Sequence, residues 1–172
     1  AWKIVYINEN AITLVKNNPA NTEIISRFAI SEDKAIERII DNLRDSNENK
    51  TDLNLIMSRF FYNINWRQPS LYFSEEVIKS DSKNRQAHLN KGLAHAHYTD
   101  SENQKLAAES IEKAIDLGLK ESRYYTILGI VYLNLGEFNE ARYSFARALE
   151  LDEKNTQARE FLNKFFDSLI IR

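Results

Sequence analysis

Cysteine is absent from this chain of 172 residues, which excludes disulfides, thiolate zinc sites and cysteine nucleophiles. Glycine occurs four times and proline twice, too few for a protein built from many tight β-turns. No apolar run approaches the roughly 20 residues that a membrane-spanning helix needs. The remaining composition, with 43% hydrophobic and 28% charged residues, is that of a folded, mainly helical protein.

An excess of positive charge is also lacking, because the formal net charge is −2. Proteins that bind nucleic acid through its phosphates usually carry a basic surface, so nucleic acid is not the expected partner. The sequence has no glycine-rich phosphate loop, no Gly-x-Ser-x-Gly elbow and no His-Glu-x-x-His helix. We therefore expect a protein that is not an enzyme and that needs no cofactor and no metal.

A sequence repeat is present in the second half of the chain. Ala114 lies in the stretch Lys-Ala-Ile-Asp-Leu, and Ala148 lies in the similar stretch Arg-Ala-Leu-Glu-Leu, 34 positions later. Val77 lies 37 positions before Ala114, and the polar stretch 98–104 accommodates the additional residues. A period of this length predicts stacked helical hairpins.

The last copy of the repeat carries a specific motif. It reads Tyr125-x2-Leu128-Gly129-x2-Tyr132-x3-Gly136-x4-Ala141-x3-Phe145-x2-Ala148, which resembles the signature of the tetratricopeptide repeat. Glu153 stands where that family usually has proline. The resemblance implies an all-α fold, in which antiparallel helical hairpins at 51–84, 85–121 and 122–155 stack in a right-handed superhelix. Residues 156–172 resemble the family's C-terminal capping helix.

Residues 1–50 precede the repeats and are interpreted as an N-terminal helical region, which could be a degenerate repeat. Ser31 and the two acidic residues after it predict the start of a helix. We also predict a helix for the first eighteen residues, although Ile4, Val5, Tyr6 and Ile7 favour a strand as well. The apolar start without an initiator Met motivates the hypothesis of a membrane anchor upstream of this sequence.

In proteins of this family the first helices of the repeats line a concave groove, which holds a segment of another protein. The resemblance places the following residues in that groove: Arg59, Tyr62, Asn63, Gln86, Leu89, Leu93, His97, Arg123, Thr126, Ile130 and Asn134. They mix apolar and hydrogen-bonding side chains with two arginines, which suits a peptide that carries a carboxylate. Trp66, beside this set, is a further candidate for anchoring a partner.

Some members of the family clamp the acidic C-terminus of chaperones with Lys, Asn and Arg side chains. Asn90 and Arg123 match two of the clamp positions. Leu55, Arg59 and Ile127 stand where the clamp requires Lys, Asn and Arg. Binding of chaperone tails is therefore disfavoured.

The three histidines do not have the spacing of a metal site. His95 and His97 point about 200° apart around a helix, so they cannot chelate one ion together. His88 and His95 occupy the two aromatic packing positions of their repeat, which predicts core or half-core side chains. His97 is predicted to face the groove.

These observations favour a non-catalytic module that binds a peptide or protein segment. The alternative is a regulatory or substrate-presenting domain of a larger membrane-anchored or enzymatic protein, and for such a domain we favour an extracytoplasmic (periplasmic) location over a cytoplasmic one. Self-association through the helical ends is a third option. The sequence alone does not identify the partner.

Overall fold

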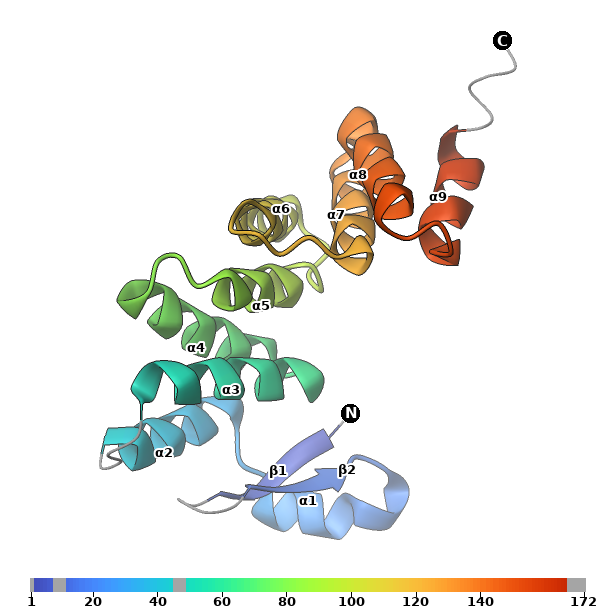
Figure 1. Cartoon of the computed structure of the whole chain (residues 1–172). Helices are drawn as coiled ribbons and strands as arrows, with labels where there is room; N and C mark the ends of the chain where they lie inside the picture. Colours follow the sequence, from blue (N-terminus) through green and yellow to red (C-terminus); the bar gives the residue numbers. More distant parts are fainter. Residues whose placement is uncertain (1, 8–11, 45–48, 167–172) are drawn as a thin grey trace. The chain divides into compact units, whose positions relative to one another are not determined.

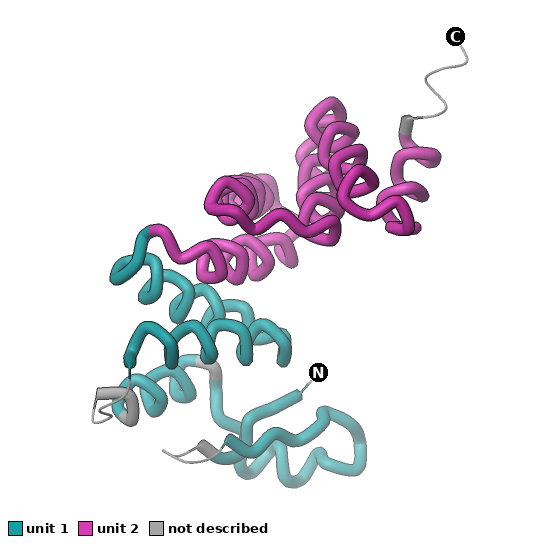
Figure 2. The backbone as a smooth tube through the Cα atoms, viewed as in Figure 1, with its two compact units in different colours: residues 1–82 teal, residues 83–172 magenta. Residues whose placement is uncertain are grey.

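The structure is a computed structural model that describes residues 2–7, 12–44 and 49–166. Within these ranges the chain forms a two-stranded sheet followed by helices α1 to α9, and a short 3-10 helix at Pro19–Asn21 precedes α1 (Figure 1). The chain divides into two compact units, residues 1–82 and residues 83–172 (Figure 2). The helical repeats have the all-α architecture that the sequence predicts.

The first unit begins with a β-hairpin, so the prediction of a helix over the first eighteen residues is wrong. Strand β1 (Trp2–Ile7) pairs with strand β2 (Ile12–Lys16) in antiparallel register. Both strands consist mainly of β-branched and aromatic residues, which pack well on a pleated surface. Ile4 in the middle of β1 is fully buried, while Trp2 and Tyr6 towards the ends of the strand are exposed.

Helices α1 (Thr22–Phe28) and α2 (Glu32–Arg44) both pack against β1. The backbone N–H of Ile30, between them, donates to the carbonyl of Ile4 over 2.8 Å. Ala35 and Ile39 of α2 are buried in the same core cluster as Ile4. A β-hairpin with two helices packed on it therefore stands where a degenerate repeat would have a pair of helices.

Helices α3 (Lys50–Asn63) and α4 (Arg67–Ser80) form a hairpin that begins one residue before the predicted range 51–84. Its core is a stack of aromatic rings, in which fully buried Phe61 lies 6.0 Å from Trp66 and 5.8 Å from Phe73, centroid to centroid. The helices approach closely because small serines occupy their interface. The Ser70 hydroxyl donates to the carbonyl of Ser58 over 2.8 Å.

The second unit contains two further hairpins, and these lie within the predicted ranges 85–121 and 122–155. The first consists of α5 (Arg85–His95) and α6 (Ser101–Asp116), and the second of α7 (Ser122–Leu135) and α8 (Phe138–Leu151). Asp100 caps α6, since its carboxylate accepts the backbone N–H of Asn103 at 2.9 Å. That bond holds the pKa of Asp100 below its usual value. Gly136, with φ 77°, ends α7 in the left-handed conformation that glycine tolerates best.

Each hairpin of this unit has one glycine in its first helix that allows the two helices to pack closely. A Cβ at Gly92 of α5 would lie 2.6 Å from Cγ1 of Ile111 and 3.1 Å from the carbonyl oxygen of Ala107. At Gly129 of α7 it would lie 2.6 Å from the ring of Phe145. These signature glycines are therefore required by contact with the partner helix.

Helix α9 (Thr156–Phe166) packs on α8 and covers its apolar face, while residues 167–172 of the predicted capping helix lie outside the described residues. The ring of Phe161 stacks on Phe145 at 5.0 Å. Asn155 ties the helix to α7, because its side-chain amide donates to the hydroxyl of Ser122 at 2.7 Å and to that of Thr126 at 2.8 Å. None of the described helices has the length and apolar character needed to span a membrane.

Candidate functional site

The predicted groove residues divide between the two units. Three of them lie on α3 in the first unit, where Arg59 and Asn63 are exposed and Tyr62 is half-buried. Burial raises the pKa of the Tyr62 hydroxyl, and the charge of Arg67 opposes part of that rise. The other eight belong to the second unit. The placement of all eleven residues in one groove stays a prediction.

Helix α7 presents a row of three predicted side chains. Arg123 and Asn134 are exposed near its two ends, and half-buried Ile130 lies between them. The Arg123 guanidinium lies 4.6 Å above the centroid of the Tyr124 ring and pairs with Glu121 at 2.8 Å. Both partners of that pair are exposed, so it adds little stability and leaves the guanidinium accessible.

Asn134 also has an internal role. Its side-chain amide donates to Oε1 of Gln104 at 3.0 Å, across the interface between α7 and α6. Gln104 is almost fully buried, and its own amide donates to the carbonyls of Ala96 and Tyr98 in the loop after α5. Substitution of Asn134 would therefore disturb packing as well as any partner contact.

Two predicted groove side chains are buried and cannot contact a partner in this structure. Leu89 is 1% exposed and packs with Ala114 and Tyr124 in a small core cluster. Thr126 is 1% exposed, and its hydroxyl is engaged by Asn155 before α9. Packing against other parts of the second unit therefore buries both side chains.

The remaining predicted residues of the second unit lie on or just after α5. Gln86 and Leu93 are half-buried, and exposed His97 lies in the turn that follows the helix. The amide of Gln86 donates to Oδ1 of Asn90 at 3.0 Å. Leu93 packs at the edge of the cluster around Leu89 and so leaves part of its side chain open.

The histidines and the central aromatic segment are mainly structural. His95 is 7% exposed and its Nδ1 lies 2.7 Å from Oδ1 of Asn103, while His88 is half-buried. No cluster of His, Cys, Asp and Glu side chains that could hold a metal occurs among the described residues. Trp66 is 4% exposed because it stacks on Phe61, so the prediction that it anchors a partner is wrong.

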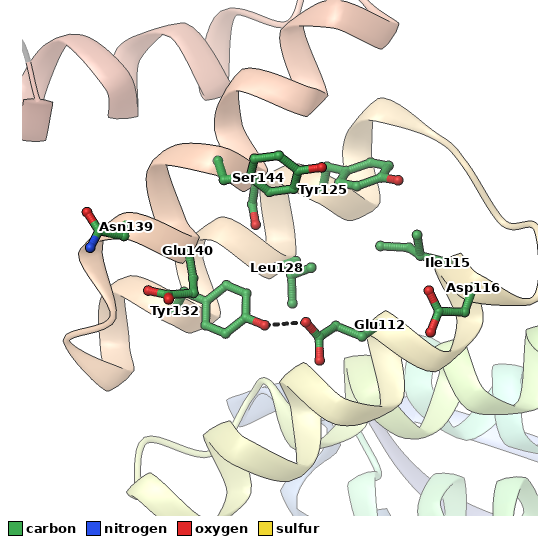
Figure 3. Close-up of a pocket in the computed structure, with 10 residues that line it drawn as sticks. Glu112, Ile115, Asp116, Tyr125, Leu128, Tyr132, Asn139, Glu140 and Ser144 are labelled. Atoms are coloured by element: carbon green, nitrogen blue, oxygen red, sulfur yellow. Dashed lines mark hydrogen bonds between the residues drawn. The ribbon is translucent and has the colours of Figure 1, made fainter.

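A pocket that the sequence analysis did not identify lies between α6, α7 and α8 (Figure 3). We call it the α6–α8 pocket, and its volume is about 590 Å³. Its buried floor consists of Ile115, Tyr125, Leu128, Tyr132 and Ser144. Its exposed rim consists of Glu112, Asp116, Asn139, Glu140 and Tyr143.

One hydrogen bond joins the floor of this pocket to its rim. The Tyr132 hydroxyl donates to a carboxylate oxygen of Glu112 (Figure 3). Burial raises the pKa of Tyr132 well above its usual value, and the bond to Glu112 and the charges of Glu137 and Glu140 raise it further. Tyr132 is therefore neutral and acts as a donor. The acidic residues that line the pocket are Glu112, Asp116 and Glu140.

The comparisons with known proteins agree with this architecture. Residues 122–155 match the family model of the tetratricopeptide repeat. Over 92 residues the chain is 28% identical to the heat shock protein STI1 of Saccharomyces cerevisiae, a match that covers 54% of this chain. The matched region spans only 15% of the length of STI1.

Solved structures show the same fold at low sequence identity. The first tetratricopeptide domain of Spaghetti (RPAP3), bound to the HSP90 peptide SRMEEVD, superposes with a TM-score of 0.63 at 18% identity, covering 70% of this chain and 94% of that one. MamA superposes with a TM-score of 0.63 at 17% identity, covering 84% of this chain and 80% of that one. Residues 122–155 therefore match a tetratricopeptide repeat, and the solved structures show that the chain shares the fold of tetratricopeptide domains.

Proposed function

We propose that the chain is a non-catalytic interaction module whose α5 and α7 helices bind an extended peptide segment that carries a carboxylate. The observation that carries this proposal is the row on α7, with exposed Arg123 and Asn134 on either side of half-buried Ile130. An arginine supplies a planar fork of donors for a carboxylate. The apolar side chain between the polar ends suits a hydrophobic residue of the peptide.

The length of the row sets the length of the peptide. Arg123 and Asn134 are eleven residues apart, which corresponds to about 16 Å along a helix at 1.5 Å per residue. An extended peptide advances about 3.3 Å per residue, so roughly five residues span this row. Leu93, open at the edge of α5, would extend the apolar part of the same surface.

The structural relatives support a peptide as the ligand class. One of them is described in complex with an HSP90 peptide and another, the second domain of human RPAP3, with an HSP70 peptide. The chain departs from the carboxylate clamp at Leu55, Arg59 and Ile127. Asn90, which matches the clamp, is 4% exposed and accepts from Gln86. We therefore expect a peptide other than a chaperone tail.

The test is a comparison of the wild-type chain with Arg123→Gln on an array of random seven-residue peptides. We expect the wild type to select peptides that contain Asp, Glu or a free C-terminus. Arg123→Gln is expected to bind the selected peptides about tenfold more weakly by fluorescence anisotropy, because a charge-assisted hydrogen bond contributes about 1.5–3 kcal/mol.

The matched control is Arg142→Gln, which removes an exposed arginine from α8 and changes the net charge equally. It should leave the affinities unchanged. The peptide SRMEEVD should bind more weakly than the selected peptides. Equal loss in both variants, or selection without acidic groups, would show that Arg123 does not form the site.

A further inference from the structure

The α6–α8 pocket lies on different helix faces from the proposed peptide surface and has the opposite charge. Its rim carries the carboxylates of Glu112 and Asp116 from α6 and of Glu140 from α8. None of the residues that line it is Lys, Arg or His. Carboxylates from two helices therefore face one hollow that contains no side-chain cation.

Aromatic rings supply the second part of the site. Tyr125 and Tyr132 form much of the floor, and each is more than nine-tenths buried. Tyr143 stands on the rim and is 65% exposed, which leaves the surface of its ring available to a ligand. Aromatic faces attract cations, and the planar guanidinium group of arginine stacks on them as well.

A serine hydroxyl on the floor adds a polar group to the site. Ser144 is 1% exposed and lines the pocket, and its hydroxyl is not among the buried side-chain atoms of the described residues that lack a partner. The hydroxyl can therefore meet water or a ligand from the pocket side. The Ser144 hydroxyl is placed to accept a hydrogen bond from a donor that enters the pocket.

An arginine close to the pocket in sequence has a hydrogen-bond partner that does not line the pocket. Arg147 lies one turn beyond Tyr143 on α8, and its guanidinium donates to the carboxylate of Glu150. That bond is the main reason why the pKa of Arg147 is raised. The charge of Arg147 also interacts with Tyr125 and Tyr143 of the pocket, but its hydrogen-bond partner Glu150 does not line the pocket. The carboxylates on the rim are therefore not paired with Arg147.

We propose that the α6–α8 pocket binds an arginine side chain presented by a segment of a partner protein. The guanidinium would pair with the carboxylates of Glu112 and Glu140, and its flat face would lie against a tyrosine ring. The methylene groups would pack on Leu128. A volume of about 590 Å³ exceeds one side chain and falls in the usual range of ligand sites, roughly 300–1,000 Å³. Residues flanking the arginine would fill the remainder.

The probe for the test is the peptide Ala-Ala-Arg-Ala-Ala, acetylated and amidated so that the side chain is its only charge. Titration into the labelled chain, followed by NMR chemical shifts at low salt, should move resonances of Tyr132, Tyr143 and Ser144. The same peptide with citrulline, which keeps the shape and removes the charge, is expected to bind at least fivefold more weakly. A lysine peptide should fall between the two, because its ammonium group lacks the planar fork.

The double variant Glu112→Gln with Glu140→Gln is expected to lower the affinity for the arginine peptide about tenfold. Its matched control is Glu109→Gln with Glu153→Gln, which removes the same charge from exposed positions outside the pocket. Circular dichroism checks that both proteins fold. Equal losses in the two doubles, equal binding of the citrulline peptide, or shifts confined to other helices would each overturn the proposal.

The outcome is independent of the proposed peptide surface. Arg123→Gln should leave the affinity for the arginine peptide unchanged, and the Glu112 and Glu140 double should leave the acidic peptides bound. If the arginine peptide did not bind the wild-type chain, the pocket proposal would be wrong, and the proposed peptide surface on α5 and α7 would be unaffected.

Discussion

Phe61→Ala is expected to lower the free energy of unfolding of the first unit by about 3–5 kcal/mol, the usual cost of truncating a buried phenylalanine. The side chain is fully buried and stacks on both Trp66 and Phe73. Alanine would leave a cavity between two rings that come from different parts of the hairpin. Since stability totals only about 5–15 kcal/mol in most domains, this loss would be a large fraction of it.

Fluorescence measures this effect selectively. The two tryptophans of the chain, Trp2 and Trp66, both lie in the first unit. Urea unfolding followed by tryptophan fluorescence should therefore shift to a lower midpoint in Phe61→Ala. Phe28→Ala is the matched control in the same unit, because Phe28 is 54% exposed and its truncation should cost little. An unchanged midpoint for Phe61→Ala would contradict the aromatic stack.

Gly92→Ala is expected to destabilise the second unit by about 2–3 kcal/mol. Its Cβ would lie 3.0 Å from the backbone nitrogen of Ile111 and 3.1 Å from the carbonyl of Ala107, and backbone cannot turn away as a flexible side chain can. Alanine is the better helix former by about 1 kcal/mol, and that gain offsets only part of the strain. The hairpin of α5 and α6 must then open slightly.

Gly129→Ala is the informative comparison for this prediction. The three atoms nearest to its Cβ all belong to the ring of Phe145, and a side-chain ring can shift more readily than backbone, so the loss should be smaller than for Gly92→Ala. Urea unfolding followed by far-ultraviolet circular dichroism gives both values. If Gly92→Ala were as stable as the wild type, the close approach of α5 to α6 would be refuted.

The helical repeats were predictable because their packing residues recur at a fixed period. Gly92, Gly129 and Phe145 are selected by contact between the two helices of a hairpin, and such contacts depend on sequence spacing within one repeat. The N-terminal hairpin was not predicted correctly, because Ile4 to Ile7 fit either a helix or a strand locally. These residues form a strand because they pair with residues 12–16 and because Ile4 is buried in the core.

The site was harder to predict than the fold. Position in a repeat placed Arg123, Ile130 and Asn134 on the accessible part of α7, but it gave no sign that Asn155 would cover Thr126. Position in the repeat also marked Tyr125 and Tyr132 as packing residues, which hid their second role in the floor of a pocket. The bond between Tyr132 and Glu112 joins residues 20 positions apart and has no signature in the sequence.

The asparagine before α9 has a consequence for protein engineering. Asn84 and Asn155 both cap the helix that follows them, accepting the backbone N–H three residues later at 3.1 Å and 3.0 Å. Helix α9 therefore starts in the same way as α5, the first helix of a hairpin. A second copy of residues 122–155 inserted after Asn155 would bring its own serine, threonine and asparagine for this junction. The array could then be lengthened one hairpin at a time, with α9 closing each version through the same amide.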